Sequence, residues 1–141
     1  MIQEKPLALV VTENLNTKLF FRKNLEDQFH VIEKKEDAAA IETAETLNLD
    51  LVIIDEKIEN AIDLCFQLKK RKRLFTTPII LITKSIKKAY RQKAIKAGVF
   101  DFLFLPLDAD QLNLLLEKCE EDKKRRKKVS SISFKLKKNN P

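Results

Sequence analysis

The stretch Asp50-Leu-Val-Ile-Ile-Asp55, DLVIID, places four consecutive apolar residues between two carboxylates. An unbroken apolar run of this length is typical of a strand buried on both faces, whereas a strand with one wet side alternates apolar and polar residues. We therefore predict a doubly buried strand here. Asp55 marks the point where this strand ends and polar surroundings begin.

Similar patterns recur on both sides of this stretch. Short apolar runs predict further strands at residues 7–11, 29–32, 77–83 and 100–105. Helical spacing of apolar residues predicts one helix after TENLN (12–16) and further helices at residues 35–47, 61–70, 86–97 and 108–119. The helix at residues 86–97 ends at Gly98.

Strands and helices thus alternate five times along the chain. Such alternation predicts an α/β fold with a parallel sheet covered on both faces and with right-handed connections. Ligands of these sheets bind outside the carboxyl ends of the strands. Asp55, Thr12, Glu13 and Thr83 should all emerge at that edge.

The net charge of +7 belongs to the end of the chain. Nine of the 28 Lys and Arg residues, and no acid, follow residue 122, so residues 1–122 carry 19 basic and 21 acidic side chains. We predict a domain at 1–122 and a basic tail or linker at 123–141. The run KKRRKK either extends the last helix or stays disordered, and the alternation of Ile132, Phe134 and Leu136 is that of an edge strand.

Several site classes are excluded by composition. No apolar run approaches the roughly 18 residues that span a bilayer, so we expect no integral membrane segment and a cytoplasmic protein. Cys65 and Cys119 are far apart without a CxxC spacing, and His30 is the single histidine, which argues against a zinc site or a Cys/His nucleophile. We interpret both cysteines as buried small hydrophobes and His30 as a strand-edge residue.

Four motifs in register resemble the receiver domain of two-component response regulators over roughly residues 6–120. They are LVVTEN (9–14), DLVIID (50–55), PIILIT (78–83) and KAGVFDFLFLP (96–106). The resemblance implies a flavodoxin-like (βα)5 fold with a doubly wound five-stranded sheet in the order 2-1-3-4-5. It also implies a signalling module in a two-component phosphorelay that switches by protein-protein contacts, not an enzyme.

The resemblance assigns a role to each residue at the strand ends. Asp55 matches the phosphoacceptor, and a Mg²⁺ ion would be held by Asp55, Glu13 and the backbone carbonyl of Lys57, with Thr12 as a weak ligand in place of the first acid. Hard cations of this kind take oxygen ligands. Thr83 matches the switch hydroxyl and Phe102 the switch aromatic, which couple the site to a remote face.

Other positions depart from the family pattern. Leu105 stands before Pro106 where receivers carry a lysine, so a cation that stabilises the acyl phosphate is missing. Lys84 follows the switch hydroxyl in place of a small residue, and it either blocks the path to Asp55 or serves as the substitute cation. Compared with the receiver pattern, the loop after Asp55 is about two residues shorter and lacks the family's proline and glycine.

Three functions therefore remain open. The first is a phosphorylated receiver whose partner is a sensor histidine kinase or phosphotransfer protein. The second is a phosphorylation-independent pseudo-receiver that acts as a scaffold or dimerisation module. The third and most distant is a nucleic-acid-associated protein that binds through its tail.

Two surfaces are candidates for protein partners. The face formed by the fourth helix, fifth strand and fifth helix is expected to support a homodimer, with Lys87, Lys88, Arg91 and Lys96 as either a basic stripe for an acidic partner or a solvated helix face. The tail is expected to meet an output domain or an anionic partner, a membrane surface included.

Overall fold

The computed structural model describes residues 4–85 and 87–138. Its strands are β1 (Leu7–Val11), β2 (His30–Lys34), β3 (Leu51–Asp55), β4 (Ile79–Thr83) and β5 (Asp101–Phe104). Its helices are α1 (Leu15–Leu25), α2 (Asp37–Thr46), α3 (Ala61–Lys69), the short 3-10 helix η1 (Lys72–Leu74), α4 (Lys88–Lys96) and α5 (Ala109–Lys138). Ile86, which the predicted fourth helix includes, lies outside the described residues.

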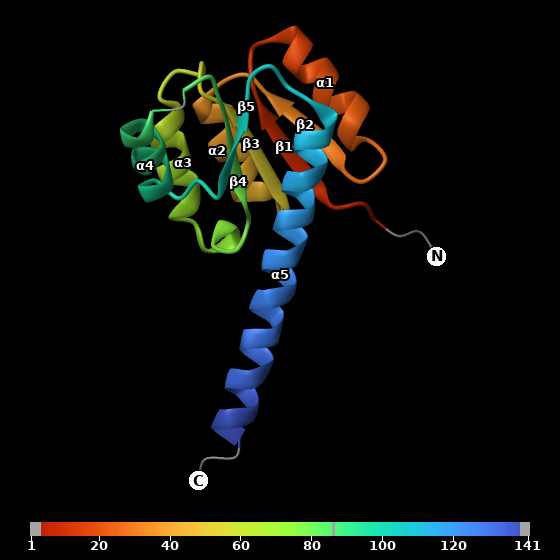
Figure 1. Ribbon diagram of the computed structural model, residues 1–141, viewed down its shortest axis with the longest axis vertical. Helices are drawn as coiled ribbons and strands as arrows, with labels where there is room; N and C mark the ends of the chain where they lie inside the picture. The colour runs from red at the N-terminus through yellow and green to blue at the C-terminus, as the bar shows by residue number, and fades with distance from the viewer. Residues whose placement is uncertain (1–3, 86, 139–141) are drawn as a thin grey trace. The chain divides into compact units, whose positions relative to one another are not determined.

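The strands form one parallel sheet in the order β2-β1-β3-β4-β5. β3 lies at its centre, where Ala8 to Val11 of β1 pair with Leu51 to Ile54 and Val52 to Asp55 pair with Ile79 to Ile82 of β4. The predicted flavodoxin-like fold and strand order are confirmed (Figure 1). Every residue of β3 and β4 is buried, as their unbroken apolar runs predict.

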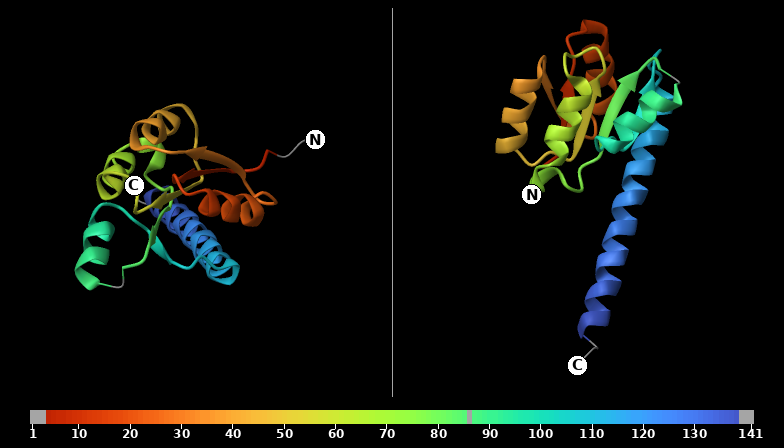
Figure 2. Two further views of the ribbon diagram at one scale, coloured as in Figure 1. Left: turned by 90° about the horizontal axis from the view of Figure 1, so that it is seen from above. Right: turned by 90° about the vertical axis from the view of Figure 1, so that its left-hand side faces the viewer.

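Helices cover both faces of this sheet. α1 lies against one face, and α2, α3 and α4 lie against the other (Figures 1 and 2). Side chains of alternate strand residues, including Leu9, Val52 and Leu81, form the core beneath α2, α3 and α4. The helices thereby bury the sheet and leave the ends of its strands as the place for a site.

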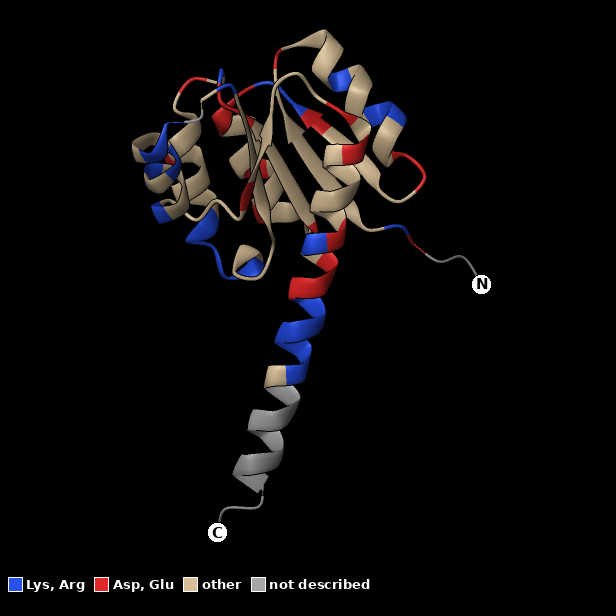
Figure 3. Cartoon of the chain, in the orientation of Figure 1, with Lys and Arg blue, Asp and Glu red and all other residues tan. Residues whose placement is uncertain are grey.

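The sheet and its first four α-helices belong to a unit that ends at Ala109, and α5 from Asp110 onward belongs to a second unit. The predicted boundary after residue 122 stays a prediction, although α5 continues through it without a break. Within α5, acidic residues are followed by the exposed basic run 123–128 (Figure 3).

The structure selects one of the open interpretations of the tail. The basic run extends the last helix, and Asp122 pairs with Arg125 at 3.2 Å and with Arg126 at 2.8 Å one turn on. The edge strand suggested by Ile132, Phe134 and Leu136 is wrong, because the backbone is helical to Lys138. Five alternating residues are too short a pattern to outweigh a helix that already runs into them.

The remaining predictions about single residues have mixed outcomes. His30 is exposed at the start of the edge strand β2, and Cys65 is buried in the core, as predicted. Cys119 is only partly buried. Among the described helices, none is both long and apolar enough to cross a membrane.

Candidate functional site

The polar residues predicted to meet at the carboxyl edge of the sheet do so in part. Asp55 is the last residue of β3, Thr83 the last of β4, and Thr12 follows β1 directly. These three residues are 5%, 0% and 0% exposed, respectively. A carboxylate and two hydroxyls are therefore buried at one end of three adjacent strands.

Hydrogen bonds from uncharged groups hold both oxygens of Asp55. The Thr12 hydroxyl donates to Oδ2 at 2.8 Å, and the backbone N–H of Lys57 donates to Oδ1 at 3.0 Å. The Thr12 oxygen in turn accepts from the N–H of Asn14 at 3.1 Å, and Asn14 caps α1 by accepting from the Thr17 N–H at 2.9 Å. The start of α1 thus fixes the hydroxyl that contacts Asp55.

A cleft of about 750 Å³ opens beside Asp55. Its lining comprises Asn14, Asn16, Thr17, Phe20, Asp55, Lys57, Ile82, Lys84, Leu105, Pro106 and Leu107. The wall at Leu105 to Leu107 is apolar where the family pattern has a lysine. Asp55 is the one carboxylate among the lining residues.

The described residues supply only part of the ligand set predicted for a Mg²⁺ ion. Glu13 is exposed and is absent from the lining of the cleft, and no group of three or more His, Cys, Asp or Glu side chains gathers in the described part of the chain. Thr12 directs its hydroxyl hydrogen toward Asp55 instead of offering a carboxylate. Since Mg²⁺ is usually held by one or two carboxylates with water or phosphate oxygens, Asp55 and the Lys57 carbonyl are a weak set.

Lys84 lies on the same cleft as Asp55, as the substitute-cation hypothesis requires. The residue is exposed, and no ion pair joins its ammonium to Asp55 among the described residues. Its backbone N–H donates to Glu56 Oε1 at 2.9 Å. The Lys84 side chain thus shares a cleft with the Asp55 carboxylate but forms no ion pair with it in this conformation.

Thr83 points its hydroxyl toward Glu56 rather than toward Asp55. The hydroxyl donates to Glu56 Oε2 and accepts from the N–H of Ser85 at 2.9 Å. Glu56 is a residue that sequence reasoning missed. Its position directly after β3 could have indicated it. β3 and β4 pair, and the Glu56 N–H continues this pairing by donating to the Ile82 carbonyl at 3.0 Å, which places Glu56 beside the end of β4.

Tyr90 on α4 belongs to the same group of side chains. Burial, and then the negative charge of Glu56, raises the pKa of Tyr90 to about 12. The Glu56 carboxylate therefore links the ends of β3 and β4, and its charge acts on Tyr90 of α4.

Phe102, the predicted switch aromatic, lies in the core beneath α2, α3 and α4. The residue is 9% exposed, and its ring stacks on Phe104 with a centroid distance of 6.1 Å. It is therefore in an inward position.

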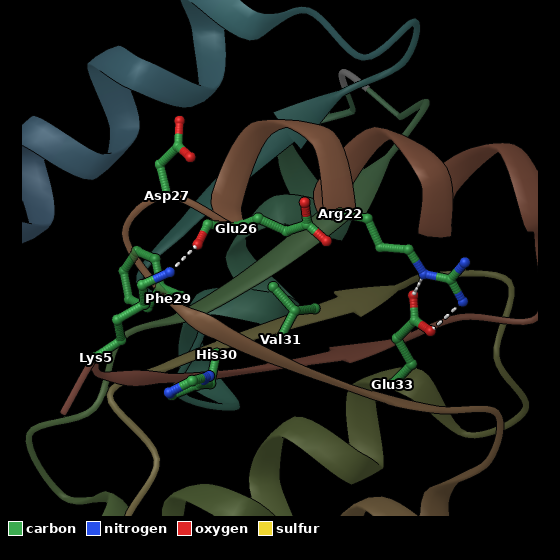
Figure 4. A pocket seen from close by; sticks show the side chains of 8 residues that line it. All are labelled: Lys5, Arg22, Glu26, Asp27, Phe29, His30, Val31 and Glu33. Atoms are coloured by element: carbon green, nitrogen blue, oxygen red, sulfur yellow. Dashed lines mark hydrogen bonds and ion pairs between the residues drawn. The ribbon is translucent and has the colours of Figure 1, made fainter.

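A second hollow, of about 480 Å³, lies between α1 and β2 (Figure 4). Arg22 forms two hydrogen bonds with Glu33, at 2.8 and 2.6 Å, and Lys5 Nζ donates to the Glu26 carbonyl at 2.8 Å. The neighbouring Glu33 carboxylate raises the pKa of Arg22 further. None of the predicted site residues lines this hollow.

Comparison with known proteins gives a family match over most of the chain. Residues 9–117 match the model described as the response regulator receiver domain. A hybrid signal transduction histidine kinase D of Dictyostelium discoideum is 25% identical over 113 residues, which are 79% of this chain and 7% of that protein. The chain therefore spans less than a tenth of the length of this relative.

Solved structures share the fold. A chemotaxis response regulator of Vibrio cholerae has a TM-score of 0.76 at 17% identity and covers 82% of this chain and 98% of its own. The receiver domain of a sensor histidine kinase from Pseudomonas aeruginosa, with a magnesium ion coordinated in its active-site cleft, has a TM-score of 0.72 at 19% identity over 81% and 96% of the two chains.

Proposed function

The chain belongs to the response regulator receiver domain family, and from this premise we propose that it works as a phosphorylation-independent receiver, a protein-interaction module of two-component signalling. Receiver domains are generally signalling modules without enzymatic turnover, and they interact with histidine kinases or phosphotransfer proteins. Members of the family bind Mg²⁺ in the active site, as the Pseudomonas structure does.

The hydrogen bond from Thr12 to Oδ2 of Asp55 is the observation that carries this proposal. Phosphoryl transfer depends on positive charge placed where negative charge develops. Asp55 instead has a hydroxyl and a backbone N–H as its partners, with an apolar wall at Leu105 on the cleft. The arrangement stabilises a resting carboxylate and offers little to a transferring phosphoryl group.

A phosphorylated receiver is the second candidate, and the position of Lys84 favours it. Asp55 would be the phosphoacceptor, as the resemblance implies, and Lys84 and Lys57 line the same cleft as Asp55. Rotation of the exposed Lys84 side chain could bring its ammonium to a phosphoryl oxygen. A sensor histidine kinase or phosphotransfer protein would then be the donor, and the switch would involve Thr83 and Phe102.

The contact surface is proposed to include α4 and β5. Lys87, Lys88 and Lys96 are exposed on or beside α4, and Arg91 is partly buried. An acidic partner or a second copy of this chain would suit such a surface. The exposed basic run of α5 suits an anionic partner, with nucleic acid as the most distant case, and a cytoplasmic location stays a prediction.

Intact-mass measurement with a phosphoryl donor separates the two candidates. The chain is incubated with Mg²⁺ and a small acyl phosphate, beside Asp55→Asn, and beryllofluoride is added in parallel as a phosphoryl mimic. We expect no adduct and no change of oligomeric state. An adduct of about 80 mass units that is absent in Asp55→Asn would refute phosphorylation independence and establish the second candidate.

A further inference from the structure

The Glu56 carboxylate accepts from the end of β4 and from the turn that follows it. Glu56 follows β3 directly, and its carboxylate accepts the Thr83 hydroxyl from the end of β4 and the Lys84 N–H from the next residue. Thr83 also accepts from the Ser85 N–H, so the turn after β4 is tied to the same group. Tyr90 packs against the core from α4, where burial and then the charge of Glu56 raise the pKa of its phenol.

We propose that Glu56 is a built-in carboxylate ligand of the Thr83 hydroxyl, which holds the end of β4 and the turn from Thr83 to Ser85 in one conformation without a phosphoryl group. The inference rests on the proposed function, since it states how a phosphorylation-independent receiver keeps its switch residue engaged. A bound anion at this edge would otherwise be needed to attract the same hydroxyl. Here the chain supplies its own.

The physical basis is the strength of hydrogen bonds to an ionised acceptor. Such bonds are shorter and roughly twice as strong as those between neutral groups. Glu56 is partly buried, which keeps water from competing fully for its oxygens. Because its donors come from the end of β4 and from the turn after it, loss of the carboxylate should loosen both together.

The composition of the chain gives this proposal a direct optical readout. Tyr90 is the single tyrosine, and there is no tryptophan. Its ultraviolet absorbance therefore reports the phenol pKa of one residue, raised to about 12 in the native chain. Glu56→Gln removes the charge and keeps the shape, so the pKa should fall below 12 while remaining above 10.0, because burial still raises it.

Amide exchange at neutral pH provides the second measurement. Glu56→Ala removes the acceptor of the Lys84 N–H and the partner of Thr83. The Lys84 and Ser85 amides, followed by NMR, should then exchange about tenfold faster, the factor that corresponds to a lost hydrogen bond to a charged group. Glu59→Ala and Glu59→Gln are the matched controls, because Glu59 is an exposed acid of the same loop and should change neither readout.

The two measurements leave clear outcomes. A lowered Tyr90 pKa in Glu56→Gln together with faster exchange in Glu56→Ala supports the proposal. An unchanged Tyr90 pKa, or amides as protected as in the native chain, overturns it. Neither measurement uses a phosphoryl donor, so failure here is distinct from the appearance of an Asp55 adduct, which tests the proposed function.

Discussion

The Thr12 hydroxyl lies 2.8 Å from Oδ2 of Asp55, and both residues are buried at the carboxyl edge of the sheet. Buried polar groups are costly unless they are hydrogen-bonded, so this contact stabilises the native state. The donor is neutral, and it comes from Thr12, which stands where the family pattern has an acid. The Asp55 carboxylate is thus hydrogen-bonded to a hydroxyl at this position. One interaction therefore bears on both stability and chemistry.

Replacement of Thr12 by valine should destabilise the chain. The change keeps the shape of the side chain but leaves Asp55 Oδ2 and the Asn14 N–H without their partner. We expect a loss of about 1–3 kcal/mol in the free energy of unfolding, measured by urea denaturation. Thr46→Val, at an exposed threonine of α2, is the control and should stay within about 0.5 kcal/mol.

Restoring the missing groups should restore phosphorylation. In a chain with Thr12→Asp and Leu105→Lys, the cleft gains an acid that can bind Mg²⁺ and an ammonium that can stabilise the phosphoryl group. We expect a Mg²⁺-dependent adduct of about 80 mass units with a small acyl phosphate. The adduct should be absent in the native chain and when Asp55→Asn is added. A double variant that stays unmodified would show that these two positions are not the cause.

The sequence predicted the fold well because the strands of this sheet are buried on both faces. The short apolar runs at Leu51 to Ile54 and Ile79 to Ile82 are typical of buried strands. Their alternation with helices then predicts a parallel sheet. The tail was less predictable. Its short alternation after Val129 carries little information beside a helix that extends through it from Ala109.

The site was predicted in its positions but not in its partners. Asp55, Thr12 and Thr83 meet at one edge because adjacent parallel strands end there. Which of them form hydrogen bonds depends on side-chain directions that a sequence does not contain. Glu56, one residue beyond β3, accepts the Thr83 hydroxyl, whereas Glu13, two residues beyond β1, is exposed. Their similar places in the sequence do not predict this difference.

Alkaline pH should destabilise the chain through Cys65. Burial raises the pKa of its thiol from 9.0 to about 12, so the unfolded state loses its proton first as the pH rises. The contribution to stability is full below pH 9 and declines between pH 9 and 12, by about 1 kcal/mol per pH unit. Tyr90 adds to the same trend above its ordinary pKa of 10.0.

Urea denaturation at about pH 8, 9.5 and 10.5 measures this decline in the free energy of unfolding. These values lie on both sides of the ordinary thiol pKa of 9.0, at which the unfolded chain loses its proton. Cys65→Ala should reduce the slope, whereas Cys119→Ala, at the partly buried cysteine, serves as the comparison. Equal slopes in the native chain and Cys65→Ala would contradict a buried, protonated thiol.

Gly98→Ala should destabilise the chain for two separable reasons. Gly98 has a φ of +102°, which side chains with a Cβ rarely adopt, and a Cβ there would lie 2.6 Å from Lys69 Cγ. Lys69 cannot easily move away, because its ammonium donates to the carbonyls of Leu74 at 3.1 Å and Thr77 at 2.7 Å. We expect a loss of roughly 1–3 kcal/mol in unfolding free energy.

A second residue with positive φ provides the control for that experiment. Asn60, before α3, has a φ of 62° and no side-chain capping hydrogen bond, so Asn60→Gly should be nearly neutral. Because Gly98 stops α4 against the end of α3, its replacement should also speed amide exchange at Val99, whose N–H donates to Ala94 at 3.1 Å. A Gly98→Ala chain as stable as the native one would mean that Lys69 and the backbone both yield, and that the close approach of α3 and α4 is not required for the fold.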